Sequence, residues 1–166
     1  MITGTVGAGK TTIGHAAARH LADAGQASGF VDLDGLSRLW PAPLGDPFRV
    51  QLTLANIASI ADNYLAAGAP SLVLAWVVED RAQLAELEEA VQRPVTMVRL
   101  VAPGPLTDER LRQRHVGPEE EGLSWHLARA PELAAIMDSS DLRAPEVQNT
   151  GSVAAAAAAV LAAARW

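Results

Sequence analysis

The chain has 166 residues, no cysteine, and 13 basic against 19 acidic side chains, which gives a formal net charge of −6. This length fits one compact domain, and the missing cysteines exclude disulfides, thiolate metal sites and cysteine nucleophiles. The acidic balance disfavours a nucleic-acid binder with a broad basic surface. The longest apolar run, residues 153–164, is too short to span a bilayer, and no export signal opens the chain, so we expect a cytoplasmic protein.

Short β-rich runs alternate with longer helical patterns. In the first half of the chain we predict strands at residues 1–3, 29–33 and 71–78, helices at 10–24 and 48–67, and an irregular proline-rich loop at 41–47. In the second half we predict helices at 80–91 and 107–115, strands at 95–101 and 147–148, and a break at 103–105. A mostly helical segment at 119–139, where Pro131 would introduce a kink, and a last alanine-rich helix capped by Ser152 complete the prediction. This alternation predicts an α/β fold with right-handed crossovers and a parallel sheet.

The turn after the first predicted strand carries the strongest motif, which matches the pattern G-x-x-x-x-G-K-[ST]. Glycines let backbone N–H groups approach phosphate oxygens, and the following helix directs its positive end at the same oxygens. Lys10, the only lysine, is expected to reach the β- and γ-phosphates, and the Thr11 hydroxyl to ligate Mg²⁺. The predicted ATP-binding loop therefore comprises Gly4, Thr5, Val6, Gly7, Ala8, Gly9, Lys10, Thr11 and Thr12.

Two carboxylates follow the second predicted strand, Asp32 and Asp34. In a parallel sheet the carboxyl ends of the strands face the ligand crevice, so both are expected there. We expect Asp34 to orient and deprotonate an acceptor hydroxyl, and Asp32 to help hold Mg²⁺. The alternative is that the pair only caps a helix turn on a loop.

An arginine-rich segment follows the fourth predicted strand. Arg110 and Arg114 are four residues apart and share one helical face. Planar guanidinium groups stabilise the charge of a transferring phosphoryl group, and a mobile helix that carries them excludes water. The alternative is a solvated basic face paired with neighbouring acids.

A third group of residues is expected around an acceptor. Arg38 follows Asp34 by four residues, and either binds an acceptor anion or pairs with Asp34. His126 and Arg129 are three residues apart, and either face the ligand or belong to a salt-bridged surface. The indoles of Trp40 and Trp76 belong either to this pocket or to the core. The predicted acceptor-binding residues are Asp34, Arg38, Trp40, Trp76, His126 and Arg129.

Together the phosphate loop, the acids after strand two and the arginines after strand four resemble the small P-loop kinases of the adenylate-kinase-like group, which includes shikimate, gluconate, adenylylsulfate and chloramphenicol kinases. The resemblance implies a three-layer α/β/α P-loop NTPase fold with a five-stranded parallel sheet of order 2-3-1-4-5. It also implies one domain over residues 1–166, an arginine lid near 105–118 and an acceptor-side region near 35–65.

The resemblance further implies roles for single residues. Arg110 takes the position of the lid arginine that stacks on adenine, and Arg114 that of the arginine that reaches the transferring phosphoryl group. Asn149 begins the loop that passes the adenine. Catalysis would then rest on Lys10, Asp34, Arg110 and Arg114, with ATP and Mg²⁺ as cofactors.

The chain also departs from that group, because the run 74–81 has neither the Asp-Gly-x-Pro-Arg motif of many nucleotide kinases nor a carboxylate in mid-strand. An acid of the Walker B type is therefore absent or replaced by Glu79 or Asp32, which argues against an ordinary nucleoside monophosphate kinase. The leading hypothesis is a kinase of a small-molecule hydroxyl, active as a monomer or homodimer without a nucleic-acid or membrane partner. The alternatives are a nucleotide-binding resistance or regulatory module without phosphoryl transfer, and a plain NTPase.

Overall fold

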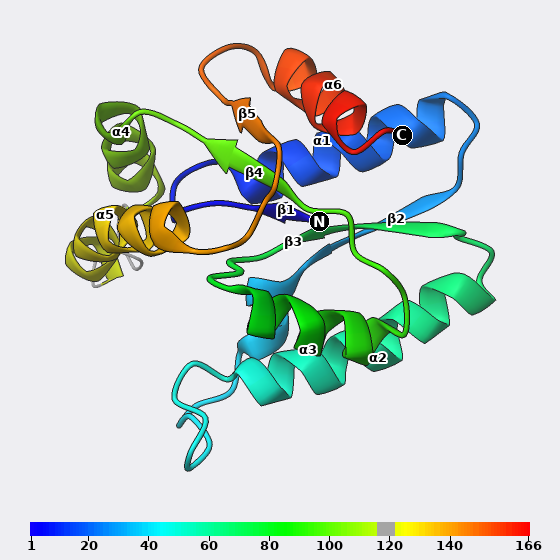
Figure 1. Ribbon diagram of the computed structural model, residues 1–166, viewed down its shortest axis with the longest axis horizontal. Coiled ribbons are helices and arrows are strands. Elements are labelled where there is room, and N and C mark those ends of the chain that lie inside the picture. Colours follow the sequence, from blue (N-terminus) through cyan, green and yellow to red (C-terminus); the bar gives the residue numbers. More distant parts are fainter. Residues whose placement is uncertain (116–121) are drawn as a thin grey trace.

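One five-stranded parallel sheet organises the protein in the computed structural model, which describes residues 1–115 and 122–166 (Figure 1). Its strand order is β2-β3-β1-β4-β5, so the predicted order 2-3-1-4-5 is confirmed. The strands are β1 (Ile2–Thr3), β2 (Ser28–Asp32), β3 (Ser71–Ala75), β4 (Val98–Val101) and β5 (Glu146–Gln148).

The central strand, β1, is only two residues long, and this limits the length over which β3 and β4 can pair with it. Ile2 pairs with Ala75 on one side and with Val98 on the other. The Trp76 N–H still donates to the Ile2 carbonyl at 3.2 Å, but two residues later the Val78 N–H donates to the Thr3 side-chain hydroxyl, at 3.0 Å. β3 and β4 are therefore shorter than the predicted 71–78 and 95–101.

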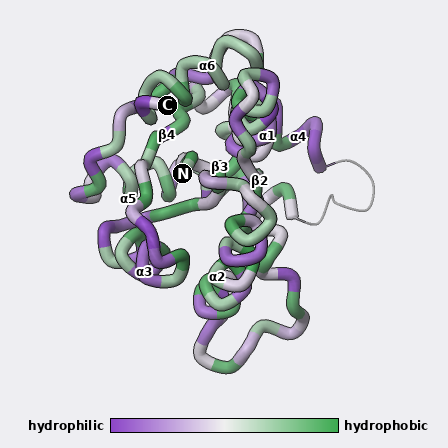
Figure 2. Tube along the Cα trace, turned by 90° about the vertical axis from the view of Figure 1, so that its right-hand side faces the viewer, coloured by the Kyte–Doolittle hydropathy of each residue, from purple (hydrophilic) through white to green (hydrophobic). Residues whose placement is uncertain are grey.

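The described part of the chain contains six α-helices, four of which cover the sheet. Figure 1 shows α1 and α6 on one face and α2 and α3 on the other, which gives the expected three layers, while α4 and α5 lie beyond the ends of the strands. Each face of the sheet has its own buried cluster, one under α1 and α6 and one against α2 and α3. The hydrophobic segments of Figure 2 include β3 and β4. The helices are α1 (Lys10–Asp23), α2 (Val50–Ala66), α3 (Arg81–Val91), α4 (Gly104–Arg114), α5 (Leu123–Ser139) and α6 (Val153–Ala163).

Two predicted helix starts are wrong, and capping explains both. α2 begins at Val50 because the Asp46 carboxylate accepts the N–H groups of Val50 and Leu52, at 2.6 and 3.3 Å. α4 begins at Gly104, inside the segment predicted to be a break. Pro105 lies in the first turn, where its missing N–H has no helical partner to lose, so proline is compatible with the start of this helix.

The predicted segment 119–139 and the predicted lid 105–118 both extend into residues 116–121, which lie outside the described residues. The described part of the former is α5, which continues through Pro131. Within residues 1–115 and 122–166, no helix combines the length and the hydropathy that crossing a membrane requires.

The buried cluster between the sheet and helices α2 and α3, called here the cluster below the sheet, allows a test of stability. Ile57 of α2 is 0% exposed within this cluster, whereas Ile60 of the same helix is only partly buried against it. Ile57→Ala should lower the free energy of unfolding by about 2–5 kcal/mol, since it removes transfer energy and leaves a cavity. Ile60→Ala should cost about 1 kcal/mol. Urea denaturation measures both, and equal losses would contradict this assignment of the core.

Candidate nucleotide-binding and acceptor site

The turn between β1 and α1 adopts backbone angles that favour glycine. Gly7 has φ +80° and Gly9 has φ +97°, both in the left-handed region. A Cβ on Gly9 would also lie 2.5 Å from the Asn149 amide nitrogen, so this position has no room for a side chain. The glycines of the motif are therefore required by conformation as well as by the close approach of a phosphate.

Lys10 is buried at the centre of this turn. Its Nζ donates to the carbonyl oxygens of Gly4 and Thr5, at 3.0 and 3.1 Å. Burial lowers the pKa of Lys10, and the nearby carboxylates of Asp34 and Asp32 oppose that shift. The predicted phosphate-binding ammonium is thus held by the loop itself and lies within electrostatic reach of both predicted acids.

Thr11 and Asp32 meet at the carboxyl end of β2. The Thr11 hydroxyl donates to Asp32 Oδ2 at 2.6 Å, and Asp32 Oδ1 accepts the Asp34 N–H at 3.0 Å. Asp32 thus also caps the short 3₁₀ helix η1 (Leu33–Ser37), as the capping alternative anticipated. A hydroxyl and a carboxylate at this distance are the hard oxygen donors that Mg²⁺ takes alongside phosphate and water.

No complete metal cage of side chains accompanies this pair. Among residues 1–115 and 122–166, no group of three or more His, Cys, Asp or Glu side chains is arranged to hold a metal ion. This suits Mg²⁺, which usually takes one or two protein ligands together with substrate phosphates. Thr11 and Asp32 therefore fit the metal-binding role predicted for them.

Asp34 lies in η1, two residues beyond Asp32. Although the residue is exposed to solvent, protein atoms surround its carboxyl group enough for desolvation to raise its pKa. Lys10 opposes this shift, Asp32 adds to it, and Arg114 also opposes it. The environment makes Asp34 a stronger proton acceptor than an ordinary aspartate, as a general base requires.

Arg110 and Asn149 converge on the loop from distant parts of the chain. The Asn149 side chain donates to the Ala8 carbonyl at 2.8 Å, and Arg110 Nη1 donates to the same oxygen at 3.3 Å. Arg110 Nη2 also donates to the Asn149 carbonyl at 3.0 Å. Arg110, the first arginine of the predicted lid, therefore lies beside the residue predicted to border the adenine.

Arg114, at the last position of α4, brings the predicted lid to the acids. Its charge lowers the pKa of His126 as well as opposing the shift of Asp34, so these three groups lie close together. Desolvation is the largest cause of the lowered His126 pKa. His126 Nδ1 lies 2.7 Å from the Gly122 carbonyl, so a neutral His126 ring donates there and leaves Nε2 as an acceptor.

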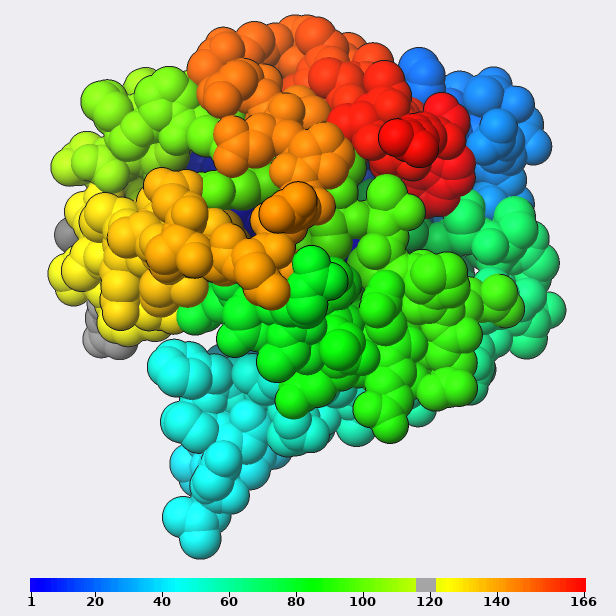
Figure 3. All heavy atoms as spheres, viewed as in Figure 1, coloured from blue at the N-terminus to red at the C-terminus, as the bar shows by residue number. Residues whose placement is uncertain are grey.

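Of the other predicted acceptor residues, Trp40 and Arg38 are exposed to solvent, whereas Trp76 is buried. Trp40 is 74% exposed on the segment 38–49, which projects from the body in Figure 3. Arg38 is also exposed, and among the described residues no ion pair joins it to Asp34. Trp76, in contrast, is 7% exposed in the cluster below the sheet, which matches the core alternative.

Arg129 is engaged by two acids. It contacts Glu79 at 2.6 Å and Glu132 at 2.8 Å, as the salt-bridge alternative anticipated. Since Glu79 is held by this arginine, the carboxylate beside Thr11 that remains for a metal is that of Asp32.

His115 adds a contact to the site that the sequence analysis does not identify, because a lone histidine at a helix end is typical of a surface. It is 6% exposed, and its ring contacts that of His126 in a tilted arrangement, with a centroid distance of 4.7 Å and an interplanar angle of 49°. This contact joins the end of α4 to α5. No sequence spacing identifies this contact, since the two histidines come from different helices. The Ala8 carbonyl as a shared acceptor is equally invisible in the sequence.

Comparison of the structure with solved structures identifies the fold. A gluconokinase from Sinorhizobium meliloti 1021 superposes with a TM-score of 0.61 at 21% identity, over 99% of this chain and 89% of that one. The APS kinase of Mycobacterium tuberculosis, solved with AMPPNP and APS, gives 0.61 at 17% identity over 99% and 95%. The tunicamycin resistance protein of Deinococcus radiodurans gives 0.59 at 20% identity over 97% and 91%.

These similarities show that the chain has the fold of P-loop kinases, as the motifs predicted. No protein-family model matches the sequence. No curated protein matches it significantly either.

The raised pKa of Asp34 predicts that its ionised carboxylate destabilises the folded protein, so that this destabilisation depends on pH. A raised folded-state pKa favours folding at low pH, and that contribution is lost as pH rises above the ordinary aspartate value, near 3.8, through the raised one. Asp34→Asn should therefore have a higher Tm than wild type at pH 7, and the difference should vanish near pH 4. Thermal denaturation across this pH range tests the prediction. Asp62→Asn, which changes an exposed aspartate of α2, is the control and should leave Tm unchanged. A lower Tm for Asp34→Asn at pH 7 would contradict the electrostatics described here.

Proposed function

We propose that this protein is an ATP-dependent kinase that transfers the γ-phosphoryl group to a hydroxyl of a small metabolite or antibiotic. The observation that carries the proposal is the convergence of Lys10, the Thr11–Asp32 pair and Asp34 at the strand ends beside the phosphate loop. The kinase fold supports the reaction class. One loop would thus hold the nucleotide while an acid with raised basicity faces the acceptor.

The chain's own residues divide the work of phosphoryl transfer. The N–H groups of the loop would bind the phosphates, and Lys10 would exchange its carbonyl partners for phosphate oxygens. Thr11 and Asp32 would hold Mg²⁺, which neutralises phosphate charge when bound. Asp34 would accept the proton of the acceptor hydroxyl, and Arg114 would stabilise the charge on the transferring oxygens.

The acceptor side favours a molecule with apolar surface. Trp40 is 74% and Phe48 69% exposed on the projecting segment 38–49, which continues directly from η1 and hence from Asp34. Arg129 is paired with two glutamates, so its positive charge is already compensated and is not available to an acceptor anion. The exposed aromatic rings support a drug-like or nucleoside-like acceptor, and the exposed Arg38 on the same segment could bind an anionic group of such a molecule.

A second function is favoured by a specific observation. β3 has no carboxylate along Ser71–Ala75, and Glu79 beyond it is paired with Arg129. A module that binds a nucleotide and a small molecule without phosphoryl transfer would need no such acid. A resistance protein among the structural neighbours agrees with either function.

One experiment separates these functions. Wild type and Asp34→Asn are incubated with ATP·Mg²⁺ and a pooled library of hydroxyl compounds, and products are detected by mass shift and phosphorus NMR. The kinase proposal predicts a phosphoester only when an acceptor is present. It also predicts a loss of turnover of about 100-fold or more in Asp34→Asn, with ATP affinity retained, since the variant lacks the general base.

Other results would contradict the kinase proposal. ATP consumption that is independent of any acceptor would identify a plain NTPase. Equal binding of a library compound by both proteins without any phosphoester would identify the non-transferring module.

A further inference from the structure

A cavity lies beside the phosphate loop, between α4 and α5. Its volume is about 480 Å³, within the range of small-molecule sites. In Figure 3 the dark-blue N-terminal residues are visible at the bottom of a hollow between the green α4 segment and the yellow-to-orange α5 segment. The lining residues used below are Thr5, Arg99, Leu100, Gly104, Asp108 and four residues of α5.

This cavity is separate from the site already described. The α5 residues that line it are Leu127, Ala130, Pro131 and Ala134, whereas His126 and Arg129 of the same helix do not. The loop contributes Thr5 alone, and Lys10, Asp32, Asp34 and Arg110 are not part of the lining. The cavity is therefore a different space from that of the phosphates and the acceptor.

The proline in α5 supplies this cavity with a hydrogen-bond acceptor. Pro131 has no N–H, so it cannot donate to the carbonyl oxygen four residues earlier, which is that of Leu127. The Leu127 carbonyl therefore lacks the N–H donor that position 131 would supply in a regular helix, and both Leu127 and Pro131 belong to the cavity lining.

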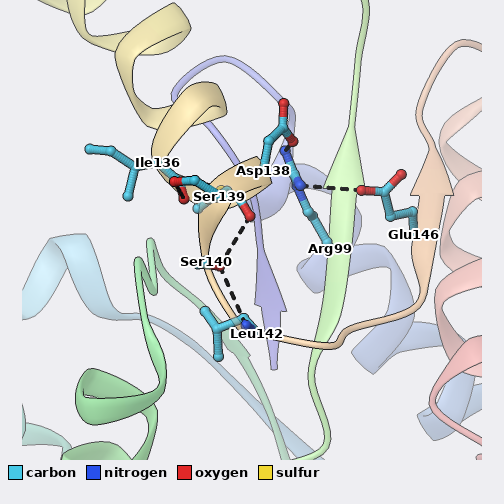
Figure 4. A network of polar contacts seen from close by, with 8 residues as sticks. Arg99, Ile136, Asp138, Ser139, Ser140, Leu142 and Glu146 are labelled. Atoms are coloured by element: carbon cyan, nitrogen blue, oxygen red, sulfur yellow. Dashed lines mark hydrogen bonds and ion pairs between the residues drawn. The ribbon is translucent and has the colours of Figure 1, made fainter.

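Charge at the cavity favours a cation. Arg99 is a lining residue, but its guanidinium contacts Asp138 at 2.6 Å and Glu146 at 3.2 Å, as Figure 4 shows. Asp138 and Glu146 lie outside the lining, and their pairing with Arg99 compensates its positive charge at the cavity. Asp108 also lines the cavity, and its contact with Arg112 is long, at 3.9 Å between two substantially exposed side chains. Such an exposed pair contributes little, so the Asp108 carboxylate is available to a ligand.

We propose that this cavity is a binding site for an apolar amine. The protonated amine would donate to the Asp108 carboxylate and to the Leu127 carbonyl, while its apolar group packs on Leu100, Ala130 and Ala134. The site lies under the helix that carries Arg110 and Arg114, so an occupant contacts the lid without entering the phosphate site. The inference does not depend on the proposed kinase function.

Three probes of similar size and different charge test the ligand class. The probes are 4-phenylbutylamine, 4-phenylbutanol and 4-phenylbutyrate, which are cationic, neutral and anionic at pH 7. Titrations followed by calorimetry and protein NMR should show saturable binding of the amine. Its affinity should exceed that of the alcohol by about fivefold and that of the carboxylate by more, because only the amine pairs with a carboxylate. Saturating ATP·Mg²⁺ should not displace it.

Four variants locate the site. Asp108→Asn should weaken amine binding about tenfold. Glu109→Gln, one residue along the same helix but outside the lining, is the matched control and should leave it unchanged. Gly104→Leu should block the cavity while the protein stays folded, because a Cβ there meets only open space. Pro131→Ala should weaken binding about threefold and raise Tm, since it restores a helix donor to Leu127.

Several results would overturn the proposal. These are no saturable binding of the amine, equal affinity for the three probes, competition by ATP·Mg²⁺, or unchanged affinity in both Asp108→Asn and Gly104→Leu. A Tm increase in Pro131→Ala with unchanged amine affinity would remove the role given to the Leu127 carbonyl, and the proposal as stated would fail.

Discussion

The backbone of the loop between β1 and α1 is the constraint on which the other positions depend. Its glycines place carbonyl oxygens inward, where Lys10 binds those of Gly4 and Thr5, and where Asn149 and Arg110 share that of Ala8. Elements from both ends of the chain and from the lid helix are thereby tied to one turn. Side chains at the glycine positions would disrupt these contacts before any nucleotide is bound.

The same loop gathers charges that folding alone would not favour. A buried ammonium with a lowered pKa and a carboxyl with a raised pKa lie near each other and near Arg114. Each shift means that the ionised group is less well solvated here than in water. Groups with shifted pKa values cluster at functional sites, where catalysis requires their altered basicity. The loss of folding free energy that they cause is offset by the buried apolar core around them.

The elements of the fold could be predicted from the sequence because their signals are local. Hydrophobic periodicity and capping residues lie within short windows, and they predicted most elements and the parallel sheet. The three layers and the strand order followed from the resemblance to small P-loop kinases that the phosphate loop and its neighbouring motifs carry. The ends of β3 and β4 could not be predicted, because they depend on the length of β1. Likewise, the partners of Trp76, Arg129 and His115 are set by contacts between elements distant in sequence, so sequence patterns left their alternatives open.

The central claim is that the loop with Lys10 binds the phosphates of ATP, and isothermal titration calorimetry with ATP·Mg²⁺ tests it most directly. We expect one saturable site in the wild type and at least about a tenfold loss of affinity in Lys10→Ala, because the variant would lose the ammonium proposed to bind the phosphates. Arg19→Ala, exposed on the same helix, should bind as the wild type does. Absence of heat with the wild type, or unchanged affinity in Lys10→Ala, would contradict the account.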